Sequence, residues 1–203
     1  MFKSVLEYPS VYRLFMEVTG NLRARSIFAR DMVKAREGDR VLDIGCGTGE
    51  MLHLLPKVDY HGFDMNDRYV AWARKKYAGR GTFRREFVSA ATLGGDAGTY
   101  DIVLASGLLH HLTDDEAADL FRLGWAALAP GGRMFTLDGC YVPGQSTLER
   151  RILAGDRGQF VRTEEEYLRL ARAEFSDIQS RVCPGLLYIP YTLVILECHK
   201  PSS

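Results

Sequence analysis

The sequence predicts an α/β fold, in which helices cover both faces of a parallel β-sheet. Short apolar segments alternate along the chain with segments that carry apolar residues at helical spacing. The run 101–105 is apolar at nearly every position, as expected for a strand that is buried on both faces. A glycine-rich turn follows the first expected strand, at the edge where such sheets bind ligands. With 203 residues, 46% of them hydrophobic, the chain suits one domain with a large core.

The elements are expected in the following order. The region 10–35 is helical, and Gly20 is expected to divide it in two. Further helices are expected at 50–55, 67–77, 113–128 and 163–174, and strands at 40–44, 60–63, 82–88, 101–105, 133–137, 178–183 and 192–199. Capping boxes are expected at Thr113…Glu116, Ser146…Glu149 and Thr163…Glu166. A turn at 130–132 should precede the fifth strand.

Composition argues against several classes of protein. Lys and Arg number 26 and Asp and Glu number 26, so no overall charge points to nucleic acid or an acidic membrane. The four cysteines form no CxxC pair or Cys/His cluster, so a metal site is not expected. Without a signal peptide or a run of about 20 apolar residues, the chain is expected to be cytoplasmic, with reduced thiols and no membrane span.

The strongest motif is the segment 41–49, VLDIGCGTG. Gly45, Gly47 and Gly49 stand between a strand and a helix, where glycine lets the backbone turn sharply and approach a ligand. Asp64 ends the second strand, 21 residues after Asp43, and can accept hydrogen bonds from both ribose hydroxyls. Met65 beside it could cover one face of an adenine. The alternative for Asp64 is a cap on the following helix.

These features fit either a dinucleotide or S-adenosylmethionine (SAM). The dinucleotide fingerprint is GxGxxG, with a pyrophosphate at the helix N-terminus. Here the spacing is GxGxG, and Glu50 at the start of the helix is expected to repel a pyrophosphate. SAM has no phosphate and carries a sulfonium cation, so it suits a site that contains Asp43 and Glu50. The sequence therefore favours SAM over NAD.

Four segments together resemble the class I (Rossmann-like) SAM-dependent methyltransferases. VLDIGCGTGE is similar to their first motif, GFDMND to the second, YDIVLASGLLHHL to the fourth-strand motif and LAPGGRMFTLD to the fifth-strand turn. The resemblance covers about residues 38–138, in the style of the small-molecule methyltransferases of ubiquinone and menaquinone biosynthesis. It implies a three-layer sandwich with a seven-stranded, mostly parallel sheet whose last strand is antiparallel. It also implies one domain over 1–203, divided into a helical lid (1–36), a SAM-binding core (37–138) and a substrate-side segment with the closing strand pair (139–203).

The resemblance also implies roles for residues. Asp43 and the backbone of Gly45, Cys46 and Gly47 would hold the methionine part of SAM, Asp64 the ribose, and Ser106 would lie near the methionine amino group. Many relatives carry Gly-Asp after the third strand, where this chain has Glu86-Phe87. The adenine is therefore left to Glu86 or Ser89, or to apolar packing by Phe87 and the backbone N–H of Val88.

Two histidines and three tyrosines are candidates for the acceptor side. His110 and His111 follow the fourth strand, and a neutral imidazole there could take a proton from a hydroxyl or amine. The alternative is that they only pack beneath the loop. Tyr8, Tyr12 and Tyr141 are candidates for the cover of the site, or for ordinary aromatic packing.

The predicted function is methyl transfer from SAM to a small-molecule acceptor, with S-adenosylhomocysteine (SAH) as product and no metal. Residues 139–175 would contact the acceptor. One alternative is a SAM-binding module without catalytic activity, and another is a nicotinamide-dependent oxidoreductase. The oligomeric state and the acceptor stay open.

Overall fold

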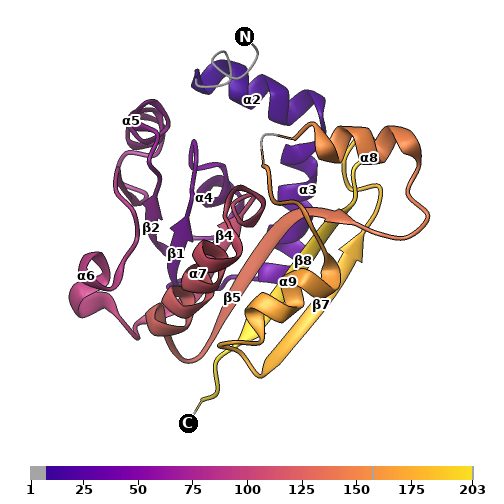
Figure 1. The fold of residues 1–203 in the computed structure, drawn as a ribbon. Coiled ribbons are helices and arrows are strands. Elements are labelled where there is room, and N and C mark those ends of the chain that lie inside the picture. Colours follow the sequence, from indigo (N-terminus) through magenta and orange to yellow (C-terminus); the bar gives the residue numbers. More distant parts are fainter. Residues whose placement is uncertain (1–7, 157, 203) are drawn as a thin grey trace.

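The central feature of the computed structural model, which describes residues 8–156 and 158–202, is one twisted sheet (Figure 1). Its seven main strands lie in the order β3-β2-β1-β4-β5-β8-β7. They are β1 (Arg40–Ile44), β2 (Asp59–Phe63), β3 (Thr82–Arg84), β4 (Tyr100–Ser106), β5 (Leu128–Tyr141), β7 (Asp177–Cys183) and β8 (Leu193–His199). Only β8 pairs antiparallel to its neighbours, β5 and β7. The predicted seven-stranded sheet with an antiparallel last strand is confirmed.

Helices cover both faces of the sheet, as predicted. One face packs against α3 (Asn21–Ile27), the following π-helix (Phe28–Val33), α4 (Glu50–Leu54), α5 (Asp67–Lys76) and α8 (Thr147–Ala154). The other packs against α6 (Ala90–Leu93), α7 (Asp114–Ala127) and α9 (Glu164–Ala171). Neighbouring strand residues alternate between the two cores: Ile102 belongs to the first and Val103 to the second. This period of two places both apolar faces of each strand out of water.

The N-terminal helical region is divided at Gly20, as expected. α2 (Pro9–Val18) ends before it, and Gly20 begins α3 with a left-handed φ of +85°. A side chain at this position would also lie 2.7 Å from the backbone nitrogen of Tyr188. The resulting bend brings α2 across the top of the sheet (Figure 1).

Several local expectations differ from the structure. The capping boxes at Thr113 and Thr163 are confirmed, but at Ser146 only half of the box forms, because the Glu149 carboxylate bonds to Gln145 and Thr192 instead. The third strand ends at Arg84 rather than 88. The turn expected at 130–132 is a register shift within β5. The two-residue strand β6 (Arg162–Thr163), which pairs with β5, and the short helix α6 were not expected.

No helix in the described part of the chain is long and apolar enough to cross a membrane.

Candidate functional site

The glycine-rich loop after β1 is the first wall of the site. The backbone N–H groups of Gly45 and Cys46 both donate to the carbonyl oxygen of Phe63, at 2.8 and 3.0 Å, which fastens the loop to the end of β2. Gly45, Gly47 and Gly49 all have positive φ angles. Glycine is the residue that adopts this conformation without steric cost, so the sequence pattern is explained by the turn.

Gly47 and Gly49 have different surroundings. A side-chain carbon at Gly47 would have its nearest neighbour 4.0 Å away, on the Tyr12 ring, so this backbone faces open space. At Gly49 it would meet the rings of Phe83 and Tyr77 at about 3 Å. Gly47 therefore lines the site. Gly49, which the sequence also placed at the site, is instead a packing position.

Asp64 joins the end of β2 to this loop. One carboxylate oxygen accepts from the Gly47 N–H and the other from the Asn66 N–H, both at 2.8 Å. Burial raises the pKa of Asp64, and the two backbone N–H groups oppose that shift. Each oxygen keeps a further lone pair for a hydroxyl donor. Asn66, and not Asp64, supplies the side-chain cap of α5, which leaves the Asp64 carboxylate at the site.

Asp43 lies behind the loop on β1, 1% exposed, and does not line the cavity. It accepts a hydrogen bond from the Tyr60 hydroxyl. Burial raises its pKa to about 6, although the Tyr60 bond and the charge of Arg25 pull in the opposite direction. Cys46 is also buried, and burial raises the pKa of its thiol.

A cavity of about 650 Å³ extends from this loop across the carboxyl ends of the strands. Its lining comes from α2 and α3, the glycine-rich loop, Asp64, the ends of β4 and β5, and two later segments, Gly155-Asp156 and residues 187–193. A volume of this size suits a small ligand of several hundred daltons. It is continuous, so a molecule at the loop end and a molecule at the far end would share one space.

Two unsatisfied polar groups mark the middle of the cavity. The Ser106 hydroxyl at the end of β4 is buried and has no hydrogen-bond partner among the described residues. Arg25 of α3 donates from Nη2 to the Ser106 carbonyl oxygen at 3.3 Å, and its buried Nε is also without a hydrogen bond within the described part of the chain. Buried polar groups are normally paired, so both are positioned for a polar ligand.

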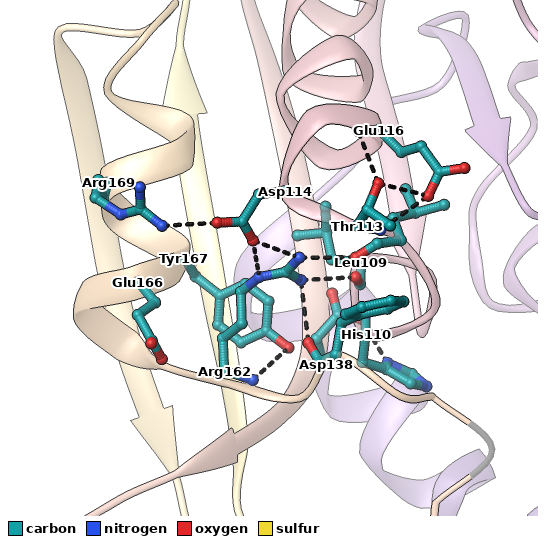
Figure 2. A network of polar contacts seen from close by, with 12 residues as sticks. Leu109, His110, Thr113, Asp114, Glu116, Asp138, Arg162, Glu166, Tyr167 and Arg169 are labelled. Carbon is teal, nitrogen blue, oxygen red and sulfur yellow. Dashed lines mark hydrogen bonds and ion pairs between the residues drawn. The ribbon is translucent and has the colours of Figure 1, made fainter.

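The far end of the cavity is built around His110. The Asp138 carboxylate at the end of β5 lies 2.8 Å from His110 Nδ1 and accepts from the His110 backbone N–H at 3.3 Å (Figure 2). On the other side of the ring, Nε2 lies 3.9 Å from a carboxylate oxygen of Asp156. Tyr191 donates to the other oxygen of Asp156 at 2.5 Å. The second oxygen of Asp138 is buried without a described partner.

The comparisons with known proteins agree with this geometry. A family model described as "Methyltransferase domain" matches residues 41–132, which include the loop, Asp64 and β4. The phosphoethanolamine N-methyltransferase of Triticum aestivum is 28% identical over 179 residues, which cover 86% of this chain and 35% of that protein. The ubiquinone biosynthesis O-methyltransferase of Methylocella silvestris is 33% identical over 102 residues, covering 49% of this chain and 39% of that protein.

The fold has a close counterpart among solved structures. Haemonchus contortus phosphoethanolamine N-methyltransferase 2, in complex with phosphomonomethylethanolamine and SAH, superposes with a TM-score of 0.67 at 18% identity, covering 85% of this chain and 52% of that one. Over residues 41–132 the chain is similar to methyltransferase domains, and it has the fold of a solved SAM-dependent methyltransferase. It spans about a third of the length of its wheat relative.

The predicted acceptor-side residues separate into two groups. His110, His111 and Tyr12 line the cavity, and the two imidazole rings lie 4.3 Å apart. Tyr8 and Tyr141 do not line it. Tyr8 is 53% exposed beside the Arg68 guanidinium, and Tyr141 is partly buried beside Arg150.

The predicted adenine contacts do not meet in the cavity. Met65 and Phe87 are exposed, the latter by 73%, and Val88 packs against the second core. β3 ends at Arg84, so the segment that carries Phe87 and Val88 is a loop rather than the strand that was expected. The adenine contacts of Met65, Phe87 and Val88 stay predictions.

Glu50 has a different role from the one inferred from the sequence. Its carboxylate lies 2.8 Å from Nε of Arg13 on α2 and 3.2 Å from the ammonium of Lys76 on α5. These cations offset the negative charge that was expected to repel a pyrophosphate. Glu50 instead fastens α2 and α5 to the start of α4.

Sequence reasoning missed four polar residues of the cavity: Arg25, Asp138, Asp156 and Tyr191. Asp138 ends the fifth-strand motif LAPGGRMFTLD and could have been found there, because strand ends of an α/β sheet meet at one edge. Arg25, Asp156 and Tyr191 belong to no motif. Their place depends on how α3, the end of α8 and the connection before β8 pack around the strand ends.

Proposed function

We propose that the chain binds SAM and transfers its methyl group to a small-molecule acceptor, releasing SAH. The observation that carries this proposal is the single cavity that joins the loop and Asp64 at one end to His110 and Asp138 at the other. Methyl transfer needs cofactor and acceptor in one space, with the reacting atoms in line and water kept out.

The residues at the glycine-loop end of the cavity fit SAM. Asp64 has lone pairs for the ribose hydroxyls, and the open space at Gly47 leaves room for a ligand against the backbone. Arg25 would hold the carboxylate of the methionine part, since its Nε is buried and unsatisfied. The Ser106 hydroxyl and the Asp43 charge lie where they would favour the ammonium group. SAM carries no phosphate, so its binding needs no phosphate site.

The residues at the His110 end of the cavity fit proton removal from the acceptor. When bound, SAM supplies an electrophilic methyl group on a sulfonium. The Asp138 carboxylate accepts hydrogen bonds and cannot donate them, so the neutral imidazole of His110 carries its proton on Nδ1, which faces Asp138. Nε2 is then the basic nitrogen. His110 Nε2 would take the proton that the acceptor O–H or N–H loses when it is methylated. Asp138 stabilises the imidazolium that results.

A methyl-transfer assay tests the proposal. SAM with a labelled methyl group is incubated with the protein and a panel of small amines, phenols and alcohols, and label in the acceptor is measured. Label transferred to at least one acceptor class supports the proposal. SAH binding without transfer to any member would identify a catalytically silent SAM-binding module instead, and binding of NAD in place of SAM would overturn the cofactor assignment.

A further inference from the structure

Arg162 is a buried cation that the catalytic proposal does not use. It lies on the two-residue strand β6, and the residue is only 5% exposed. Its side chain makes five hydrogen bonds: Nε and Nη2 donate to one oxygen of Asp114, Nη1 to the carbonyls of Leu109 and Phe160, and Nη2 to the carbonyl of Leu112. A guanidinium has five N–H donors, so every donor of Arg162 is used.

These bonds hold the turn that carries His110. Residues Leu109–His111 form a 3-10 helix, and the carbonyls of Leu109 and Leu112 on either side of the histidine pair accept from Arg162. The carbonyl of His110 itself accepts from the Phe160 N–H at 3.0 Å. Figure 2 shows the guanidinium of Arg162 between this turn and Asp114. The backbone of the turn is thus fixed from the Arg162 side, and from the opposite side by Asp138.

Arg162 also contacts the segment after Asp156 and the end of β5. Arg162 bonds the Phe160 carbonyl, four residues after Asp156, and β6 pairs with the end of β5 next to Asp138. The Tyr167 hydroxyl accepts from the Arg162 N–H at 3.4 Å and donates to the Gly139 carbonyl at 3.0 Å. Arg162 therefore connects the segments that carry His110, Asp138 and Asp156.

Asp114 anchors the arrangement from α7. One of its oxygens takes both bonds from Arg162, and the other accepts from Arg169 at 2.8 Å. Arg169 is 63% exposed at its side chain, and among the described residues it bonds Asp114 rather than the turn. The chain thus offers two arginines on the same carboxylate, of which only one reaches the His110 turn.

We propose that Arg162 is a positioning residue for the acceptor half of the site, which sets the direction of the His110 imidazole through the carbonyls of the turn. The proposal rests on the role of His110 in the proposed function. It requires the planar fork of arginine, because a lysine ammonium has three donors at one point and cannot reach the Leu109, Leu112 and Phe160 carbonyls together with Asp114.

The test compares Arg162→Lys with the matched control Arg169→Lys. The ring ¹⁵N resonances of His110, assigned by their loss in His110→Asn, report its tautomer and need no acceptor. We expect the wild type and Arg169→Lys to show one tautomer, protonated at Nδ1, and Arg162→Lys to show a mixture. The resonances of His61 and His199 should be the same in all three proteins. Identical His110 spectra in wild type and Arg162→Lys would overturn the proposal.

Kinetics separate positioning from stability. With an acceptor identified, Arg162→Lys should lower kcat by about 10²-fold, as a misplaced catalytic group does, while the Kd for SAH changes less than about threefold. Arg169→Lys should leave both unchanged. Equal losses of SAH affinity and of kcat would assign Arg162 to the fold alone and overturn the proposal.

If Arg162→Lys does not fold, Asp114→Asn serves in its place. It keeps one acceptor oxygen for Arg162, replaces the oxygen that accepts from Arg169 by an NH₂ group and removes the charge, and the His110 spectrum should shift in the same direction but less. An unchanged His110 spectrum in a folded Asp114→Asn protein would then overturn the proposal. If the wild type does not bind SAH, the proposed function fails, but the His110 spectra still decide the role of Arg162.

Discussion

Asp43 connects stability to cofactor binding, and Asp43→Asn separates the two. In the folded protein burial raises its pKa to about 6, from 3.8 in an unperturbed carboxyl. A raised pKa means that the folded state binds the proton more tightly than the unfolded state. The carboxyl therefore favours folding fully below about pH 4, and this contribution is lost as the pH rises to about 6. Asparagine cannot ionise, so the variant escapes this loss.

The magnitude follows from the shift. A rise of about two units corresponds to about 3 kcal/mol. We take the free energy of unfolding of Asp43→Asn minus that of the wild type. This difference should be about 3 kcal/mol more positive at pH 8 than at pH 4, in favour of the variant. A constant cost also applies at every pH, about 1–3 kcal/mol, because the new amide N–H₂ is buried without an assured acceptor. The pH dependence of the difference is unaffected by that constant.

Urea unfolding at pH 4, 5, 6, 7 and 8 measures the difference. Asp119→Asn is the control, because Asp119 is 69% exposed on α7 and its variant should follow the wild type at every pH. At pH 8 the same Asp43→Asn protein should bind SAH about 10-fold more weakly, since it loses the negative charge behind the glycine-rich loop that favours the ammonium group. A stability difference that is equal at pH 4 and pH 8 would refute the assignment of a raised pKa to Asp43.

Four further variants test individual parts of the site. Asp64→Ala should weaken SAH binding about 10–100-fold, measured by calorimetry, because two charge-assisted bonds to the ribose are lost; an unchanged Kd in a folded protein would remove the ribose assignment. Gly47→Val should abolish SAH binding with a modest drop in Tm, whereas Gly49→Val should lower Tm much further because its side chain meets Phe83 and Tyr77. The reverse pattern would exclude Gly47 as the ligand-facing glycine. His110→Ala should lower the methyl-transfer rate about 10²–10⁴-fold with little change in SAH affinity, and a variant that instead loses SAH binding and stability would indicate a packing role.

The fold could be predicted in detail because its signals are local. Buried parallel strands are apolar runs, Gly20 needs a positive φ, and the boxes at Thr113 and Thr163 satisfy helix N-termini within four residues. The prediction at Ser146 went wrong because Glu149 found partners from elsewhere, Thr192 among them, which lies 43 residues away in the sequence. Local chemistry cannot foresee such competition.

The sequence could predict those site residues that lie at the ends of strands. Ser106 ends a strand, Gly47, Asp64 and His110 follow strands, and all four line the cavity. Arg25 and Tyr191 could not be found, because they reach the cavity from α3 and from an irregular connection whose path depends on packing. Arg162 was overlooked for a related reason: it acts on the carbonyls of a turn 50 residues earlier, and backbone acceptors leave no trace in a sequence pattern.

Calorimetric titration of the purified protein with SAH, and separately with NAD, tests the central claim most directly. The account predicts saturable binding of SAH at one site per chain and no binding of NAD. Arg25, Ser106 and Asp64 line the cavity and offer partners to a carboxylate, an ammonium group and a ribose, which SAH carries together. Tight binding of NAD by a folded protein that does not bind SAH would contradict it.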